Sequence, residues 1–115
     1  MIDFDRDTAF TQRVLDALAM RGKMSLHNIA NQNTPGFKRY EVRFEELLQQ
    51  ASSAGKDLAS VRHEVVHDTS GAPEANNVVL MDEMALLGKT SLLHDVMTRR
   101  LAGYTQKLNK AIFGR

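Results

Sequence analysis

The composition of this 115-residue chain describes one small domain without a strong charge and without cysteine. Lys and Arg number 15 against 14 acidic residues, so the net charge of +1 gives no basic field for nucleic acid or an anionic membrane. Neither a disulfide framework nor a cysteine-based metal site can form. Charged residues interrupt every long segment, so we expect no membrane insertion. The first seven residues carry three aspartates where a secretory signal would be basic, so we also expect no cleaved signal peptide.

The first predicted element is a long amphipathic helix from about residue 7 to residue 31. Its apolar positions recur at spacings of three and four, which places them on one face of a helix. They are Phe10, Val14, Leu18, Gly22, Leu26 and Ile29. This face is expected to pack against another helix, in the same chain or in a neighbouring subunit.

An amide-rich run, Asn28–Phe37, ends this helix. Pro35 presets φ for the second position of a turn and Gly36 can take the positive φ of the third, so the sequence predicts a type II turn. Pro35 also moves Thr34 out of the helical region, and the helix should therefore end by about Asn33. The asparagines of the run are expected to cap the last carbonyl groups of the helix.

The middle of the chain is predicted to be short and irregular. One short amphipathic helix is expected around Phe44, Leu47, Leu48 and Ala51, followed by a flexible connection over residues 51–55. Val61, Val65 and Val66 indicate one short extended segment.

A second long helix is predicted from about Asp82 to Phe113. Its apolar stripe consists of Leu86, Leu93, Met97, Leu101, Tyr104, Leu108 and Ile112. Leu92 and Val96 broaden this stripe beyond the width that one partner helix covers. This breadth favours contact with another chain, and a hairpin or small bundle closed within one chain is the alternative.

The predicted fold is mainly α. The long terminal helices pack as an elongated, coiled-coil-like hairpin around a short irregular or extended middle segment. We place the N-terminal helix and its turn at residues 1–36, the middle segment at 37–76 and the C-terminal helix at 77–115, together one elongated domain.

One short motif in the middle segment suggests catalysis. His63, Glu64 and His67 spell H-E-x-x-H, which on a helix would bring two imidazoles to zinc with the glutamate as general base. The surrounding valines favour a strand, in which the two imidazoles do not converge on a metal. A small zinc hydrolase therefore remains an alternative of a different class.

Other catalytic patterns are absent from the sequence. It contains no G-x-S-x-G, no phosphate-binding glycine loop and no cysteine nucleophile. We therefore expect no catalytic, metal-binding or cofactor-binding residues, and a protein that is not an enzyme.

Two motifs carry a resemblance to a known family. The first follows Arg21 and resembles the N-terminal signature of bacterial flagellar axial proteins, which include rod, hook and hook-associated proteins. It consists of Asn28, Ile29, Ala30, Asn31, Asn33, Thr34, Pro35, Gly36, Phe37 and Lys38. The second resembles the signature that opens the C-terminal helix of rod proteins, and consists of Asn76, Asn77, Val78, Leu80, Glu83 and Met84. The short distance between the helices points to the smallest class, the proximal rod proteins; the FlgC-type proximal rod class, with a longer middle, is the alternative.

Three residues depart from the family pattern: Gln32, Phe37 and Val79. At position 79 the family usually has an aspartate, which would cap the C-terminal helix. Without that cap, we expect the first turn of the helix to begin later, at Asp82.

The resemblance implies a structural function. Rod proteins are exported through the flagellar type III apparatus without a cleaved signal and assemble into the periplasmic rod of the basal body. Their terminal helices, poorly ordered in the monomer, pair on assembly into a helical tube that transmits torque. The implied partners are other copies of the chain, adjacent rod proteins, the junction between rod and MS ring, and the export apparatus, with neither nucleic acid nor a cofactor.

Overall fold

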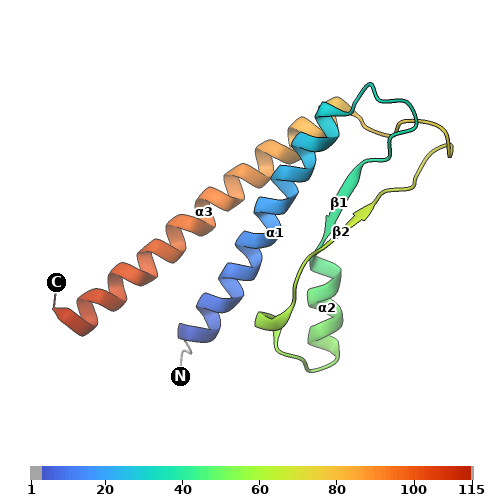
Figure 1. The fold of residues 1–115 in the computed structure, drawn as a ribbon. Helices are drawn as coiled ribbons and strands as arrows, with labels where there is room; N and C mark the ends of the chain where they lie inside the picture. The colour runs from blue at the N-terminus through green and yellow to red at the C-terminus, as the bar shows by residue number, and fades with distance from the viewer. Residues whose placement is uncertain (1–3, 115) are drawn as a thin grey trace.

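Two long antiparallel helices and a small two-stranded sheet make up the protein in a computed structural model that describes residues 4–114 (Figure 1). The elements are α1 (Phe4–Ala30), β1 (Tyr40–Arg43), α2 (Glu45–Ser53), a 3-10 turn (Leu58–Ser60), β2 (Glu64–His67) and α3 (Leu80–Phe113). Helix α1 lies between α3 on one side and the sheet on the other. The Cα positions extend over 60 × 33 × 14 Å, so the molecule is elongated. The predicted mainly α hairpin of terminal helices with a short middle segment is confirmed.

The small core surrounds the middle of α1. Its buried apolar side chains are Leu15, Ala17, Leu18, Val42, Phe44 and Ala51. Val42 in β1 and Phe44 just after it are buried and alternate with the more exposed Glu41 and Arg43, as the period of a strand requires, and β1 packs against α1. The burial of Ala51 explains why α2 continues to Ser53, so the prediction of a flexible connection beginning at residue 51 is wrong.

The sheet joins two segments that are distant in sequence. Strands β1 and β2 pair antiparallel, with Tyr40 opposite His67 and Arg43 opposite Glu64. The extended segment predicted around the valines is confirmed as β2, but β1 was not predicted as a strand. Its sequence, Tyr-Glu-Val-Arg, carries two charged residues and becomes a strand only because its partner and α1 meet it in space.

Helix α3 begins earlier than its missing cap suggested. Its first residue is Leu80, and the cap residue Val79 makes no side-chain hydrogen bond, so the predicted start at Asp82 is wrong. The amide of Glu83 donates to the carbonyl of Val79 at 3.0 Å and closes the first turn. Asp82 and Glu83 also place negative charge at the positive end of the helix dipole, which favours a start without a capping side chain.

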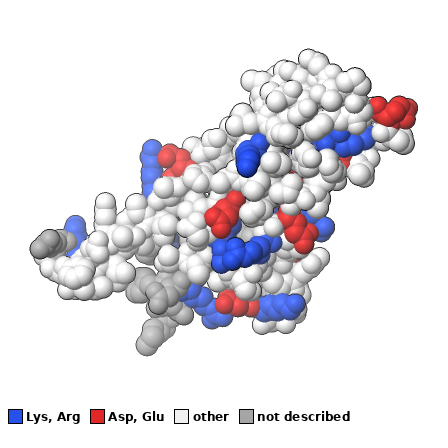
Figure 2. All heavy atoms as spheres, in the orientation of Figure 1, with Lys and Arg blue, Asp and Glu red and all other residues white. Residues whose placement is uncertain are grey.

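The two halves of α3 differ in how much of their surface the chain covers. Within the described part of α3 only Glu83 and Thr90 are buried, and both lie in its N-terminal half. The large apolar residues that α3 exposes beyond Thr90 are Leu92, Leu93, Val96, Tyr104, Leu108, Ile112 and Phe113. On the face that Figure 2 shows, few charged side chains appear on the projecting C-terminal part of α3, whereas acidic and basic residues mix over the body of the molecule.

The predicted apolar stripe of α1 is also covered unevenly, but its exposed part lies toward the C-terminal end of the helix. Leu18 is buried and Val14 and Phe10 are partly buried against the rest of the chain, but Leu26 is 57% exposed. Polar side chains, Ser25 and Asn28, take the buried positions near the end of the helix. No described helix is apolar over enough of its length to cross a membrane.

Candidate functional site

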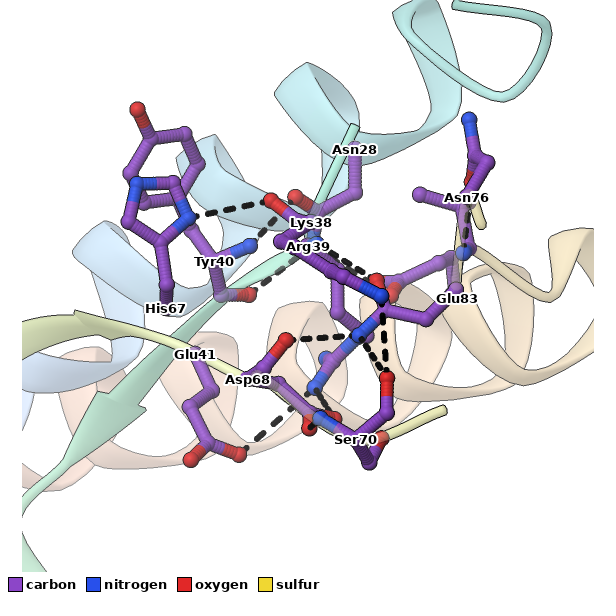
Figure 3. A network of polar contacts seen from close by, with 12 residues as sticks. Asn28, Lys38, Arg39, Tyr40, Glu41, His67, Asp68, Ser70, Asn76 and Glu83 are labelled. Carbon is purple, nitrogen blue, oxygen red and sulfur yellow. Dashed lines mark hydrogen bonds and ion pairs between the residues drawn. The ribbon is translucent and has the colours of Figure 1, made fainter. Parts of the chain in front are cut away.

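The two signature motifs meet at one end of the molecule, which we call the junction. It comprises the end of α1, the turn at residues 31–36, β1, segment 68–79 and the first turn of α3. Figure 3 shows its polar side chains converging from these elements. The junction is built from hydrogen bonds between side-chain amides and backbone groups and from a buried ion pair, so its chemistry is that of a structural joint.

The predicted turn is present. Helix α1 ends at Ala30, the amide of Phe37 donates to the carbonyl of Thr34 at 3.2 Å, and Gly36 has φ of +72°. These are the features of a type II turn with glycine in its third position. The stop by residue 33 and the turn at Pro35 and Gly36 are confirmed.

Replacing Gly36 with valine should destabilise the protein by about 1–3 kcal/mol, because a β-branched residue is strained at positive φ. A Cβ at this position would also lie 3.6 Å from the carbonyl oxygen of Glu74, so the turn has little freedom to move toward segment 68–79. Urea unfolding of the variant measures the cost. Gly55→Val is a matched control for strain alone, since Gly55 also has positive φ, lies away from the junction and has no atom within 4 Å of its added Cβ. Equal stability of wild type and Gly36→Val would contradict the strain.

Asn28 joins α1 to β1. Its side chain is fully buried, at 0% exposure. Its Oδ1 accepts from the amide of Tyr40 and its Nδ2 donates to the carbonyl of Tyr40, both at 2.8 Å. The side-chain amide thus pairs with β1 as a neighbouring strand would, on the edge of β1 that faces away from β2. Its Nδ2 also lies 3.3 Å from Oε1 of Glu83 on α3.

Asn76 joins the second signature to the first. Its Nδ2 lies within hydrogen-bonding distance of three carbonyl oxygens just beyond α1, those of Asn31 at 2.9 Å, Gln32 at 3.1 Å and Thr34 at 2.8 Å. Its Oδ1 accepts from the amide of Val78 at 2.8 Å. A residue more than forty positions away thus holds the carbonyl groups of the chain just beyond the end of α1. The predicted local cap is also present, since Nδ2 of Asn31 donates to the carbonyl of His27 at 2.9 Å.

Asn77 is inserted between the ends of the two strands. Its Oδ1 accepts from the amide of Arg39 at 2.7 Å, and its Nδ2 donates to the carbonyl of Asp68 at 2.6 Å. The amide of Asp68 still donates directly to the carbonyl of Arg39 at 2.9 Å. The asparagine therefore replaces one bond of the strand pair and ties segment 68–79 to the sheet.

A buried ion pair links α3 to β1. Glu83 is 1% exposed, and its Oε1 accepts from Nε of Arg39 at 2.5 Å. The Arg39 guanidinium also lies 3.4 Å from Asp68 and 3.6 Å from Glu41. Burial acts to lower the pKa of Arg39, but the hydrogen bonds and charges of Glu83 and Asp68 outweigh it, so its pKa is raised and the group stays charged.

The junction should weaken in acid through Asp68. Hydrogen bonds from Ser70, first from its backbone amide, and the nearby Arg39 lower the pKa of Asp68. A lowered pKa stabilises the fold above the ordinary aspartate pKa of about 3.9, and this contribution is lost as the pH falls through the lowered value. We therefore expect Asp68→Asn to flatten the fall in stability below about pH 4, measured by urea unfolding across pH. An unchanged slope in the variant would contradict the assignment.

The side chains of the remaining signature residues lie at the junction without making its polar contacts. Asn33, Leu80 and Met84 are exposed, and Ile29 and Val78 are half-buried. Ala30 is the last residue of α1. Their role as signature residues stays a prediction. Leu80 and Met84 add exposed apolar surface to the first turns of α3.

The H-E-x-x-H motif does not form a zinc site here. Glu64–His67 is a strand and not a helix, so His63 and His67 are not one helical turn apart. The His67 ring lies 4.1 Å from that of Tyr40, with its Nδ1 3.1 Å from the carbonyl oxygen of Lys38. The described residues contain no group of three histidine or acidic side chains able to hold a metal.

Sequence reasoning missed Arg39, Tyr40 and Asp68. Arg39 directly follows the first signature, and Asp68 lies between the valines and Gly71 in a stretch for which the sequence predicted no role. The only sequence signal was the excess of asparagine at both motifs, which indicates side-chain amides bonded to backbone groups.

Comparison with known proteins identifies the family. No known family profile matches the chain. A flagellar basal body rod protein FlgB of Borreliella burgdorferi is 30% identical over 131 residues, covering 95% of this chain and 97% of the relative. The chain belongs to the FlgB family of flagellar basal body rod proteins. FlgB of Bacillus subtilis is 26% identical over 90% of each chain, and FlgB of Aeromonas hydrophila is 33% identical over 63% of this chain and 55% of the relative.

Membership of the FlgB family confirms the predicted proximal rod class and its structural function. Nothing in the comparisons points to the FlgC type or to a zinc hydrolase. The signature residues therefore build a joint between the two terminal helices.

Proposed function

We propose that this chain builds the flagellar rod by packing the uncovered apolar faces of its terminal helices against neighbouring subunits. The observation that carries this proposal is the C-terminal half of α3, where no described residue is buried after Thr90 while seven large apolar side chains are exposed. Exposed apolar surface of this extent on a soluble helix is typical of an interface.

The partners follow from the same surface. Other copies of the chain and adjacent rod proteins cover α3 and the exposed part of α1, and a head-to-tail contact of this kind generates an open helical assembly. We place the assembled protein in the periplasmic part of the basal body, where its packed helices resist shear and transmit torque. Delivery is through the type III export apparatus without a cleaved signal.

We also propose that the chain is not an enzyme. The names of its relatives describe a structural rod component, and its H-E-x-x-H motif lies on a strand. Stoichiometric zinc in the purified protein, lost on replacement of His63 and His67 together with motility, would contradict this part of the proposal.

The assembly surface is tested by adding charge to it. Leu92 and Val96 are four residues apart on one exposed face of α3, at 64% and 51% exposure. Replacing both with glutamate should abolish motility and rod assembly while leaving the fold intact, because neither side chain belongs to the core. Ala102→Glu adds a single negative charge at an exposed position on a different, more polar face of α3, beside Thr98 and Gln106, and should preserve motility. Normal motility of the double variant would contradict the proposed packing.

The isolated chain should be ordered at the junction and poorly ordered at the free end of α3. A helix without covering contacts is only marginally stable in water, whereas the core holds the middle of α1. We expect backbone amides near Leu101 and Leu108 to exchange roughly tenfold or more faster than that of Leu18 in the monomer, and to become protected in the assembled rod. Strong protection at Leu101 in the free monomer would contradict this.

A further inference from the structure

Residues 69–75, which lie between β2 and α3, have no apolar anchor. Residues 69–75 read Thr-Ser-Gly-Ala-Pro-Glu-Ala, all are exposed, and none belongs to a helix or strand. Nevertheless this segment leads directly into Asn76 and Asn77, whose amides must be placed accurately to bridge the junction. Polar contacts therefore have to hold it.

One cation makes the largest set of these contacts. Nζ of Lys38 lies 2.7 Å from the carbonyl oxygen of Ala72, 2.7 Å from that of Ala75 and 3.2 Å from that of Ser70. An ammonium group has three hydrogen atoms to donate, and here each has an acceptor. Three carbonyl dipoles directed at one point repel one another unless a positive charge lies between them.

The surroundings suit a cation. The carboxylate of Asp68 accepts from the amide of Ser70 at 3.0 Å, which adds negative charge beside the carbonyl groups. The carbonyl of Ala72 also accepts from the amide of Ala75 at 3.0 Å, and this bond folds the segment into the turn that directs its carbonyl groups inward. Gly71, with φ of +83°, allows the backbone reversal that the turn needs.

We propose that residues 70–75 form a carbonyl cradle for a primary ammonium ion, occupied in this chain by the side chain of Lys38. Lys38 is a positioning residue: it shapes the cradle and, through it, places Asn76 and Asn77. A planar guanidinium does not match three converging acceptors, because its donors lie in one plane. The ligand class is therefore a primary alkylammonium.

Chemical rescue tests the cradle. In the full chain, Lys38→Ala should speed amide exchange at Ala75 and Val78 by about tenfold or more, since both amides are bonded within or just beyond the cradle, while the amide of Leu18 is unaffected. Methylammonium should restore protection in a saturable manner. Tetramethylammonium at equal ionic strength should not, because it has no N–H to donate. Lys56→Ala, at an exposed lysine elsewhere on the surface, is the matched control and should change neither amide.

Each arm has a result that contradicts the proposal. Unchanged exchange in Lys38→Ala would show that the segment is held by other contacts, and equal rescue by tetramethylammonium would show that only charge matters. If Lys38→Ala does not fold, a measurement on the wild-type protein still tests the cradle, because an ammonium group bound by three carbonyl groups exchanges its protons slowly with water. The ¹⁵N-detected ammonium signal of Lys38 should then be visible under conditions where that of Lys56 is not, and its absence would overturn the cradle.

Discussion

Replacing Asn28 with alanine should destabilise the protein by about 2–4 kcal/mol, one of the two largest losses expected from any single substitution at the junction. The change removes the partner of both the amide and the carbonyl of Tyr40, and the alanine leaves them facing a position that is 0% exposed. Each unsatisfied buried backbone group costs about 1–3 kcal/mol. Urea unfolding at neutral pH measures the loss.

A neighbouring asparagine provides the control. Asn33 belongs to the same amide-rich run and is exposed, so Asn33→Ala should change the free energy of unfolding by no more than about 0.5 kcal/mol. If the two variants were equally stable, the strand-like pairing of Asn28 with β1 would contribute nothing to the free energy of unfolding.

Glu83→Ala should cost about 3–5 kcal/mol, the usual effect of removing one member of a buried ion pair. The guanidinium of Arg39 would keep Asp68 and Glu41 but lose its shortest contact, and the amide of Asn28 would lose an acceptor. Glu83→Gln keeps an oxygen acceptor and should cost less. Asp82→Ala, exposed on the same turn of α3, is the control for the loss of a charge near the start of the helix.

The two large effects should not add. Nδ2 of Asn28 and Nε of Arg39 share Oε1 of Glu83, so the Asn28→Ala and Glu83→Ala losses describe one network. We expect the double variant to be more stable than the sum of the single losses predicts, by about 0.5 kcal/mol or more. Strict additivity would mean that the contact at 3.3 Å between Asn28 and Glu83 has no energetic weight.

The helices and the turn were predictable because their causes are local. A period of three and four residues defines α1 and α3, and the φ preferences of Pro35 and Gly36 define the turn. The predicted start of α3 was wrong for a physical reason. The missing aspartate at Val79 is a local loss, but the position of the helix is set by Asn76 and by contacts to β1 and α1 that sequence spacing does not reveal.

The contacts of the junction were beyond local reasoning. Asn76 caps groups more than forty residues away, and β1 becomes a strand only against β2 and Asn28. The spacing of apolar residues along the sequence carries no information about contacts between such distant residues. The resemblance to flagellar axial proteins identified the asparagines as signature residues, and the structure supplies the reason for several of them: an amide side chain carries a donor and an acceptor together, as a peptide bond does.

The uneven covering of α3 makes the two ends of the molecule differ in stiffness. At the junction, polar contacts from α1, the sheet and α3 act together, and the N-terminal half of α1 is held against the 3-10 turn, where Nε of Arg13 donates to the carbonyl of Ala59 at 3.1 Å. Beyond Thr90, no described residue of α3 is buried. We therefore expect the C-terminal half of α3 to bend slightly while the rest of the molecule stays rigid, which would let one subunit meet neighbours at slightly different spacings.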